Sequence, residues 1–173
     1  AGACWLGSRR CPDQAGDIAL LIGAAVCIQL RLLCNLLDGM VAVEGGLRSP
    51  TGELWNDVPD RFADVLILVP VGYATGVAWG PELGWVAGMA ALLTAYQRWL
   101  GAGVGRGQDF GGPLAKPQRM AVLTVAGLVG AAARPWQHDG QVLFAALGLI
   151  VLGALLTVAL RLRRLARRMG TPP

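Results

Sequence analysis

The chain has 173 residues, of which 54% are hydrophobic and 15% are charged, and its formal net charge at pH 7 is +4. This composition excludes an ordinary soluble domain. The basic residues lie in loops and at the C-terminal end rather than along one face, which argues against nucleic acid as a partner. Four cysteines are too few for a disulfide scaffold, and we read them as unpaired thiols.

The apolar runs predict an all-α, polytopic membrane helix bundle. Residues 1–10 are expected to be the end of a helix that leaves the membrane. Further helices are expected at 17–43, 56–78, 86–100, 120–133 and 141–160. Because crossing a bilayer takes roughly 20 apolar residues, we expect about five transmembrane helices in this chain.

The distribution of basic residues predicts the orientation of these helices. The short turn at 79–85 and the loop at 134–140 fall on one side, together with Arg9, Arg10 and Arg134. The opposite side carries most of the lysine and arginine, so the positive-inside rule places it in the cytoplasm. Its residues are Arg48, Arg61, Arg98, Arg106, Lys116, Arg119, Arg161, Arg163, Arg164, Arg167 and Arg168.

Two further features agree with a membrane location. Residues 161–173 are expected to form a basic cytoplasmic tail that lies against anionic lipid. All six tryptophans fall near the ends of predicted helices, as in an aromatic belt at the membrane interface.

Polar residues interrupt the apolar pattern between positions 35 and 64. On a helix Asn35 and Asp38 lie on one face, and on the next helix Asn56, Asp60 and Asp64 recur every four residues. Two such stripes at the ends of membrane helices predict an oxygen-lined pocket. Hard divalent cations such as Mg²⁺ bind oxygen ligands of this kind.

The spacing of this stretch is more specific than its composition. Residues 35–60 follow the pattern N-x2-D-G-x2-A-V-x8-G-x3-N-x3-D. This resembles the signature of the CDP-alcohol phosphatidyltransferases, D-x2-D-G-x2-A-R-x8-G-x3-D-x3-D, in the same register and with no insertion. Three positions depart from it: Asn35 and Asn56 stand at aspartate positions, and Val43 stands at an arginine position.

The resemblance implies a membrane transferase of phospholipid biosynthesis. Such an enzyme moves a phosphatidyl or phospho-alcohol group from a CDP-linked donor to an alcohol acceptor, with release of CMP and dependence on Mg²⁺ or Mn²⁺. Residues 1–173 would be a single domain of this type, with the first of six transmembrane helices largely missing. The protein would be a homodimer in the bacterial cytoplasmic membrane, with membrane lipids around it and an active site facing the cytoplasm.

Site residues are carried over from the signature by position. The metal ligands would be Asn35, Asp38, Asn56 and Asp60, and Asp60 would also be the catalytic base that takes the acceptor's proton. The remaining candidates would contact substrate. These are Gly39, Ala42 and Gly52, which leave room for the nucleotide, and Lys116 and Arg119, which would bind a phosphate group.

Other interpretations of these residues remain open. Arg31 and Asp64 lie deeper in their helices and are expected to form a buried ion pair. The asparagines at two aspartate positions also fit a degenerate homologue that binds nucleotide or lipid without catalysis. A third possibility is a small ion transporter whose path uses Arg31, Asn35, Asp38 and Asp60.

Overall fold

The protein is an all-α bundle in a computed structural model that describes residues 1–11, 13–44 and 51–170, without the side chains of residues 42, 43, 53 and 54. The all-α class is confirmed over these residues. The elements in chain order are α1 (Gly2–Ser8), α2 (Gln14–Glu44), α3 (Gly52–Thr75), α4 (Gly80–Gly103), α5 (Lys116–Ala133), the 3₁₀ turn η1 (Arg134–Trp136) and α6 (Asp139–Gly170).

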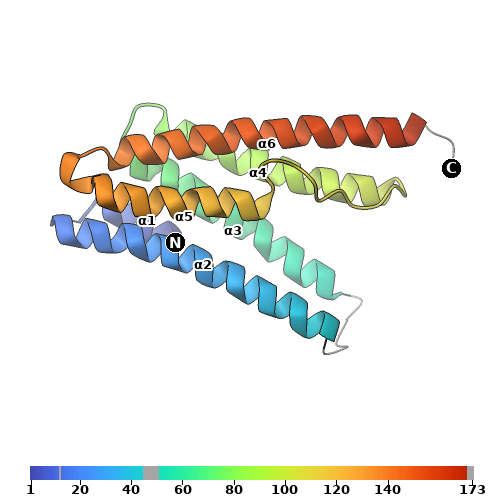
Figure 1. The fold of residues 1–173 in the computed structure, drawn as a ribbon, viewed down its shortest axis with the longest axis horizontal. Coiled ribbons are helices and arrows are strands. Elements are labelled where there is room, and N and C mark those ends of the chain that lie inside the picture. The colour runs from blue at the N-terminus through green and yellow to red at the C-terminus, as the bar shows by residue number, and fades with distance from the viewer. Residues whose placement is uncertain (12, 45–50, 171–173) are drawn as a thin grey trace.

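The helices run along the long axis of the molecule and alternate in direction (Figure 1). The connections α1–α2, α3–α4 and α5–α6 lie at one end. The end of α2, the start of α3, the α4–α5 connection and the end of α6 lie at the other, which we call the basic end. The end of α2 and the start of α3, which carry the signature residues, therefore share one end of the bundle with the α4–α5 connection, as the distribution of basic residues predicts.

Helix packing places α3 against α4, α2 against α5, and α6 against α3, α4 and α5, while the short α1 packs on α2 and α3. The core between them includes Trp5, Leu68, Met120 and Leu147, each fully buried. Trp5 is therefore a core residue, and the expected aromatic belt is wrong at this position. The other five tryptophans are between 40% and 74% exposed.

Glycines set the close approach of α3 and α4. A Cβ added at Gly72 would lie 2.9 Å from the Cα of Gly84, and one added at Gly84 would lie 2.9 Å from the carbonyl oxygen of Val69. Since real side chains avoid such distances, this crossing requires glycine at both positions. Small residues at a helix interface are the usual means of close packing in membrane proteins.

The expectation of about five transmembrane helices is wrong. Within the described ranges, two segments are long and apolar enough to cross a membrane, Gln14–Val41 of α2 and Asp139–Gly170 of α6. The first half of α3 carries Asp57, Asp60, Arg61 and Asp64, and α5 has only 18 residues and begins with a lysine. α4 contains five glycines, and its apolar run is bounded by Glu82 on one side and by Gln97 and Arg98 on the other.

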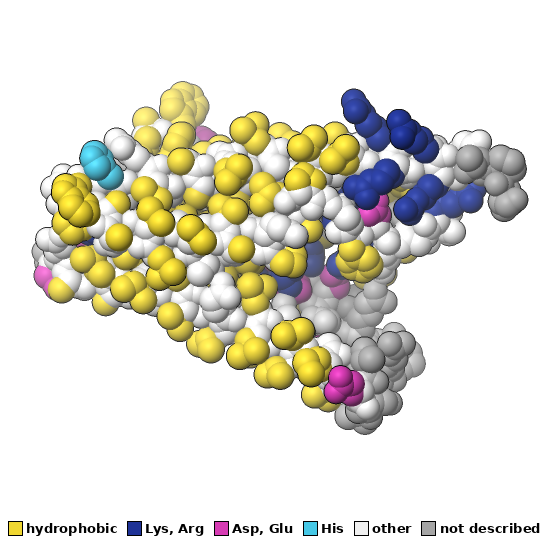
Figure 2. All heavy atoms as spheres, in the orientation of Figure 1, with side chains coloured by type: hydrophobic (Ala, Val, Ile, Leu, Met, Phe, Trp, Pro, Cys, Tyr) yellow, Lys and Arg dark blue, Asp and Glu magenta, His cyan; other side chains and the backbone are white. Residues whose placement is uncertain are grey.

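The surface nevertheless suggests a membrane protein. Figure 2 shows hydrophobic side chains spread along the bundle and basic side chains gathered where α6 ends. Large apolar residues are exposed along α2 and α6, for example Leu30 at 55% and Leu152 at 70%. Monomeric soluble proteins rarely expose so continuous an apolar surface.

The segment expected as a basic tail begins inside the bundle. α6 continues without a break to Gly170, and Arg161 is only 7% exposed. Its guanidinium donates to the carbonyl oxygens of Gly111 at 2.9 Å and Thr94 at 2.7 Å. Arg161 thus fixes the α4–α5 connection against α4 and α6, whereas Arg163 and Arg167 are exposed.

We predict that Gly72→Val destabilises the bundle, by about 1–3 kcal/mol or more, because the new side chain overlaps α4. Thermal unfolding in detergent, followed by circular dichroism, measures the loss. Gly148→Val is the matched control, since a Cβ at Gly148 of α6 meets nothing within 4 Å. Equal melting temperatures for the two variants would contradict the described α3–α4 crossing.

Candidate functional site

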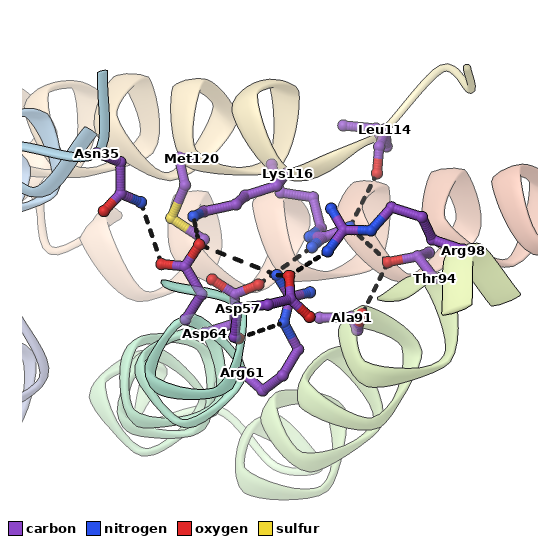
Figure 3. A network of polar contacts seen from close by, with 12 residues as sticks. Asn35, Asp57, Arg61, Asp64, Ala91, Thr94, Arg98, Leu114, Lys116 and Met120 are labelled. Carbon is purple, nitrogen blue, oxygen red and sulfur yellow. Dashed lines mark hydrogen bonds and ion pairs between the residues drawn. The ribbon is translucent and has the colours of Figure 1, made fainter. Parts of the chain in front are cut away.

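The carboxylate of Asp60, on α3, joins three helices. Its Oδ1 accepts hydrogen bonds from Arg31 Nη2 at 2.9 Å and from Asn35 Nδ2 at 3.0 Å, both on α2. Its Oδ2 is ion-paired with the ammonium group of Lys116 at the start of α5. Figure 3 shows the side chains of Asn35 and Lys116 directed toward the carboxylates of α3. Asp60 is therefore surrounded by nitrogen donors.

Asp64 lies one turn farther into the bundle, and its side chain is only 1% exposed. Its Oδ1 accepts from Arg31 Nη1 at 3.0 Å, which confirms the expected ion pair. Its Oδ2 accepts from Arg119 Nη2 at 3.3 Å. Arg119 also donates to Thr94 Oγ1 at 3.1 Å and to the carbonyl oxygen of Leu114 at 3.2 Å. This buried guanidinium links α5 to α3, to α4 and to the loop before α5.

Asp57 forms the outer part of the same network. It accepts hydrogen bonds from Arg61 Nη2 at 3.1 Å and from Trp99 Nε1 at 2.7 Å, and it is ion-paired with Arg98. The guanidinium of Arg98 lies 5.2 Å from the centre of the Phe110 ring, a cation–π distance. The α4–α5 connection is thereby held close to α3 and α4.

Two cavities open beside these ion pairs. The first, which we call the signature cavity, has a volume of about 310 Å³ and is lined by Asn35, Asn56, Asp57 and Asp60. It thus contains residues of the signature from both α2 and α3. The second, which we call the arginine cavity, has a volume of about 320 Å³ and is lined by residues of α3, α4, α5 and α6 and of the α4–α5 connection. These include Thr94, Arg119 and Arg161.

The two cavities are adjacent, because four residues line both: Arg61, Arg98, Phe110 and Lys116. Volumes of this size are at the lower end of the range of about 300–1,000 Å³ found for small-molecule sites. The two cavities therefore share three positive charges, those of Arg61, Arg98 and Lys116.

Asp60 is held in its charged form. Burial raises the pKa of Asp60, but the hydrogen bond and charge of Lys116, with Asn35 and Arg31, outweigh burial and bring this pKa below its ordinary value. Burial also lowers the pKa of Lys116, and the attraction of Asp60 offsets only part of that change.

The structure brings together three of the four predicted metal ligands, Asn35, Asn56 and Asp60, around the signature cavity. Asp38 is exposed and does not line this cavity. Beside it, a Cβ added at Gly39 would meet nothing within 4 Å, so this glycine leaves open space instead of packing against another helix.

The other predicted substrate contacts are distributed differently. Lys116 lines both cavities, and Arg119 lines the arginine cavity. Gly52 is half-buried at the start of α3. The side chain of Ala42 lies outside the described residues, as does that of Val43.

The predicted Mg²⁺ or Mn²⁺ remains untested, but the donor set does not fit such an ion. Among the described residues, no group of three or more His, Cys, Asp and Glu side chains could hold a metal. Divalent cations need several free oxygen ligands, whereas the oxygens of Asp57 and Asp60 already accept from nitrogen donors. The network has five cations and three carboxylates: Arg31, Arg61, Arg98, Lys116 and Arg119 against Asp57, Asp60 and Asp64.

Sequence reasoning missed the part played by Arg61, which it used for topology alone, and that of Arg161, which it placed in a tail against anionic lipid. The four-residue spacing of Asp57 and Arg61 on one helix was an available signal, and the two are ion-paired at 3.1 Å. For Arg161 the signal lies in α6, where the buried residues Ala154 and Thr157 precede it at helical spacing. That pattern extends the buried face of the helix to the arginine.

Comparisons with known proteins give one partial match. The chain is 33% identical over 116 residues to a bifunctional IPC transferase and DIPP synthase of Rubrobacter xylanophilus, an alignment that covers 65% of this chain and 26% of that protein. The chain thus spans about a quarter of the length of this curated relative. No family model matches the chain, and no solved structure matches it.

We predict that Asp64→Asn lowers the free energy of unfolding by about 3–5 kcal/mol, because it leaves the buried Arg119 without its counter-charge and removes one of the two carboxylates paired with Arg31. Denaturant or thermal unfolding in detergent measures the change. Asp38→Asn, at an exposed position on the neighbouring helix, is the control and is expected to stay within about 0.5 kcal/mol of the parent. An unchanged stability for Asp64→Asn would show that this ion-pair network does not hold the helices together.

Proposed function

We propose that the protein is a membrane transferase that moves a phosphatidyl or other phospho-alcohol group from a CDP-linked donor to an alcohol acceptor, releasing CMP. The observation that carries the proposal is the signature cavity. Asn35 from α2 meets Asn56 and Asp60 from α3 there, in the register of the CDP-alcohol phosphatidyltransferase signature.

The partial relative supports the same class at the level of the family. Its name includes a transferase activity, and 65% of this chain aligns with it. The similarity supports a CDP-alcohol type of transferase and does not identify the donor or the acceptor. Both substrates are therefore part of the proposal.

The proposed reaction transfers a group between two oxygen atoms. The acceptor hydroxyl attacks the phosphorus that bears the alcohol, the bond from this phosphorus to the bridging oxygen breaks, and CMP leaves with the electron pair. A carboxylate that takes the hydroxyl proton assists this step. Asp60 is the candidate base, since it is ionised and lines the cavity.

The arginine cavity is the proposed site for a phosphate of the acceptor or of a lipid. Its walls include the guanidinium groups of Arg98, Arg119 and Arg161. The Nε atoms of Arg98 and Arg119 are buried and have no hydrogen-bond partner in the described part of the chain. Guanidinium groups bind phosphate oxygens with strong, charge-assisted hydrogen bonds.

We also propose that the protein crosses the cytoplasmic membrane at least through α2 and α6, with its basic end in the cytoplasm. The two candidate spans and the exposed apolar residues of these helices support this placement. The arginines at the end of α6 give the orientation, by the positive-inside rule. A homodimer remains a prediction from the family resemblance.

A second candidate is a homologue that binds a nucleotide or a phospholipid without turnover. The observation in its favour is the amide at two signature positions, together with Asp38 outside the signature cavity. This candidate keeps the same binding site and lacks only the chemical step.

We predict that the full-length protein in nanodiscs releases CMP from CDP-diacylglycerol when offered a suitable alcohol. Asp60→Asn should lower this rate by about 10²–10⁴-fold, as expected for loss of a base. Asp109→Asn is the matched control, because Asp109 is at the same end, lines neither cavity and pairs with Arg164. A panel of phosphorylated and simple alcohols, with CMP and product mass measured, tests both variants.

CDP binding without CMP release from any acceptor would favour the second candidate. If the protein neither binds CDP nor releases CMP, the proposed function is wrong.

Cysteine labelling tests the orientation. In a background without native cysteines, His138→Cys in the α5–α6 connection should react with an impermeant reagent added to intact cells. Arg163→Cys near the end of α6 should react only after the membrane is opened. Both positions are exposed in the structure, so burial does not explain a difference. The reverse pattern would place the site outside the cytoplasm.

A further inference from the structure

The further inference rests on the proposed function and concerns the charge that neutralises the donor's diphosphate. Each carboxylate of the network that lines the signature cavity is already paired. Asp60 is bound by Arg31, Asn35 and Lys116, and Asp57 lies against arginines and a tryptophan. A divalent cation would have to displace several of these donors before it could bind.

Two of the signature positions have lost negative charge. Asn35 and Asn56 line the cavity with neutral amides, and the amide nitrogen of Asn35 is used to bind Asp60. Hard cations are held by charge as well as by geometry, so two amides in place of carboxylates weaken such a site. A cavity of this composition suits an anion better than a cation.

Positive charge is supplied instead by side chains. Lys116, Arg61 and Arg98 line the signature cavity, and their side chains are 18–20% exposed, so they are accessible to a ligand. Each of them is now ion-paired with Asp57 or Asp60. An anion that enters the cavity can therefore replace Asp57 or Asp60 as the partner of one of these cations, by a change of side-chain conformation and without movement of a helix.

We propose that Lys116, assisted by Arg61 and Arg98, binds the diphosphate of the nucleotide donor directly, so that binding requires no divalent cation. Lysine suits this exchange, because its ammonium is a point charge on a flexible stem. When the ammonium turns from Asp60 to a phosphate oxygen, the Oδ2 of Asp60 loses its near partner and keeps only Arg61 Nη2, at 3.9 Å. Binding of the diphosphate to Lys116 thus makes the carboxylate of Asp60, the candidate base, more accessible.

The test is calorimetry on the full-length protein in detergent, with CDP and with inorganic pyrophosphate, in excess EDTA and in excess Mg²⁺. Both ligands should bind in EDTA, and Mg²⁺ should change the Kd of CDP by less than about threefold, under 0.7 kcal/mol. Lys116→Gln should weaken CDP binding in EDTA by about tenfold or more. Lys116→Arg, which keeps the charge, should recover part of the affinity and guards against a merely misfolded variant.

Arg164→Gln is the matched control. Arg164 is a cation at the same end, pairs with Asp109 at 3.0 Å and lines neither cavity. Its substitution should leave the Kd of CDP unchanged. Equal weakening by Arg164→Gln and Lys116→Gln would reduce the effect to general surface charge and would overturn the inference.

The opposite change is made at the asparagines. Asn35→Asp combined with Asn56→Asp adds two carboxylates to the cavity, so CDP should bind more weakly in EDTA and should regain affinity in Mg²⁺. A double variant with the parent's behaviour in both conditions would mean that these positions do not face the ligand, and would contradict the proposal.

The outcomes separate this inference from the proposed function. CDP binding only in the presence of Mg²⁺ would overturn the inference and leave the proposed function standing. Binding of pyrophosphate but not of CDP in EDTA would support the anion site and contradict the CDP-linked donor. Failure of both ligands to bind in either condition would overturn the inference.

Discussion

The burial of Asp60 and Asp64 inside a helical bundle is the constraint on which the site depends. A carboxylate in such surroundings is costly unless it is paired. Arg31 is paired with both residues at once, because its Nη2 binds the carboxylate of Asp60 and its Nη1 binds that of Asp64. α2 makes its main helix contacts with α1 and α5 rather than with α3, so this arginine and Asn35 bridge the two signature helices through side chains.

The same requirement explains why the site is positively charged. Satisfying the two carboxylates brings Lys116 and Arg119 from α5 to the network, and the basic residues then outnumber the acidic ones. In a site for a divalent cation the balance would be reversed. The two cavities that share Lys116 therefore have the character of anion sites, which agrees with a substrate that carries a diphosphate. In the proposed transfer, Asp60 is the one ionised group assigned to the chemistry.

Local features of the sequence predicted the local features of the site. The spacing of Asn35, Asn56 and Asp60 identified three residues that line one cavity, and the depth of Arg31 and Asp64 in their helices predicted their ion pair.

Periodicity gives the face of a helix, but not the helix that packs opposite. It therefore did not indicate that the second partner of Asp64 is Arg119 of α5, more than 50 residues away. Asp38 shares a face with Asn35 yet is exposed, as are most of the side chains described in the last turns of α2. The number of membrane helices was overestimated, since charged residues in α3 and the short length of α5 weigh against spanning.

The central claim is that side-chain cations, with Lys116 foremost, hold the nucleotide diphosphate at the signature cavity. A structure of the full-length protein with CDP bound in the presence of Mg²⁺ tests this most directly, through the partners of the diphosphate oxygens. We expect the Lys116 ammonium to lie within hydrogen-bond distance of a diphosphate oxygen, with no metal between the diphosphate and Asp60. A Mg²⁺ ion bridging Asp60 and Asn35 to the diphosphate, with Lys116 still paired to Asp60, would contradict it.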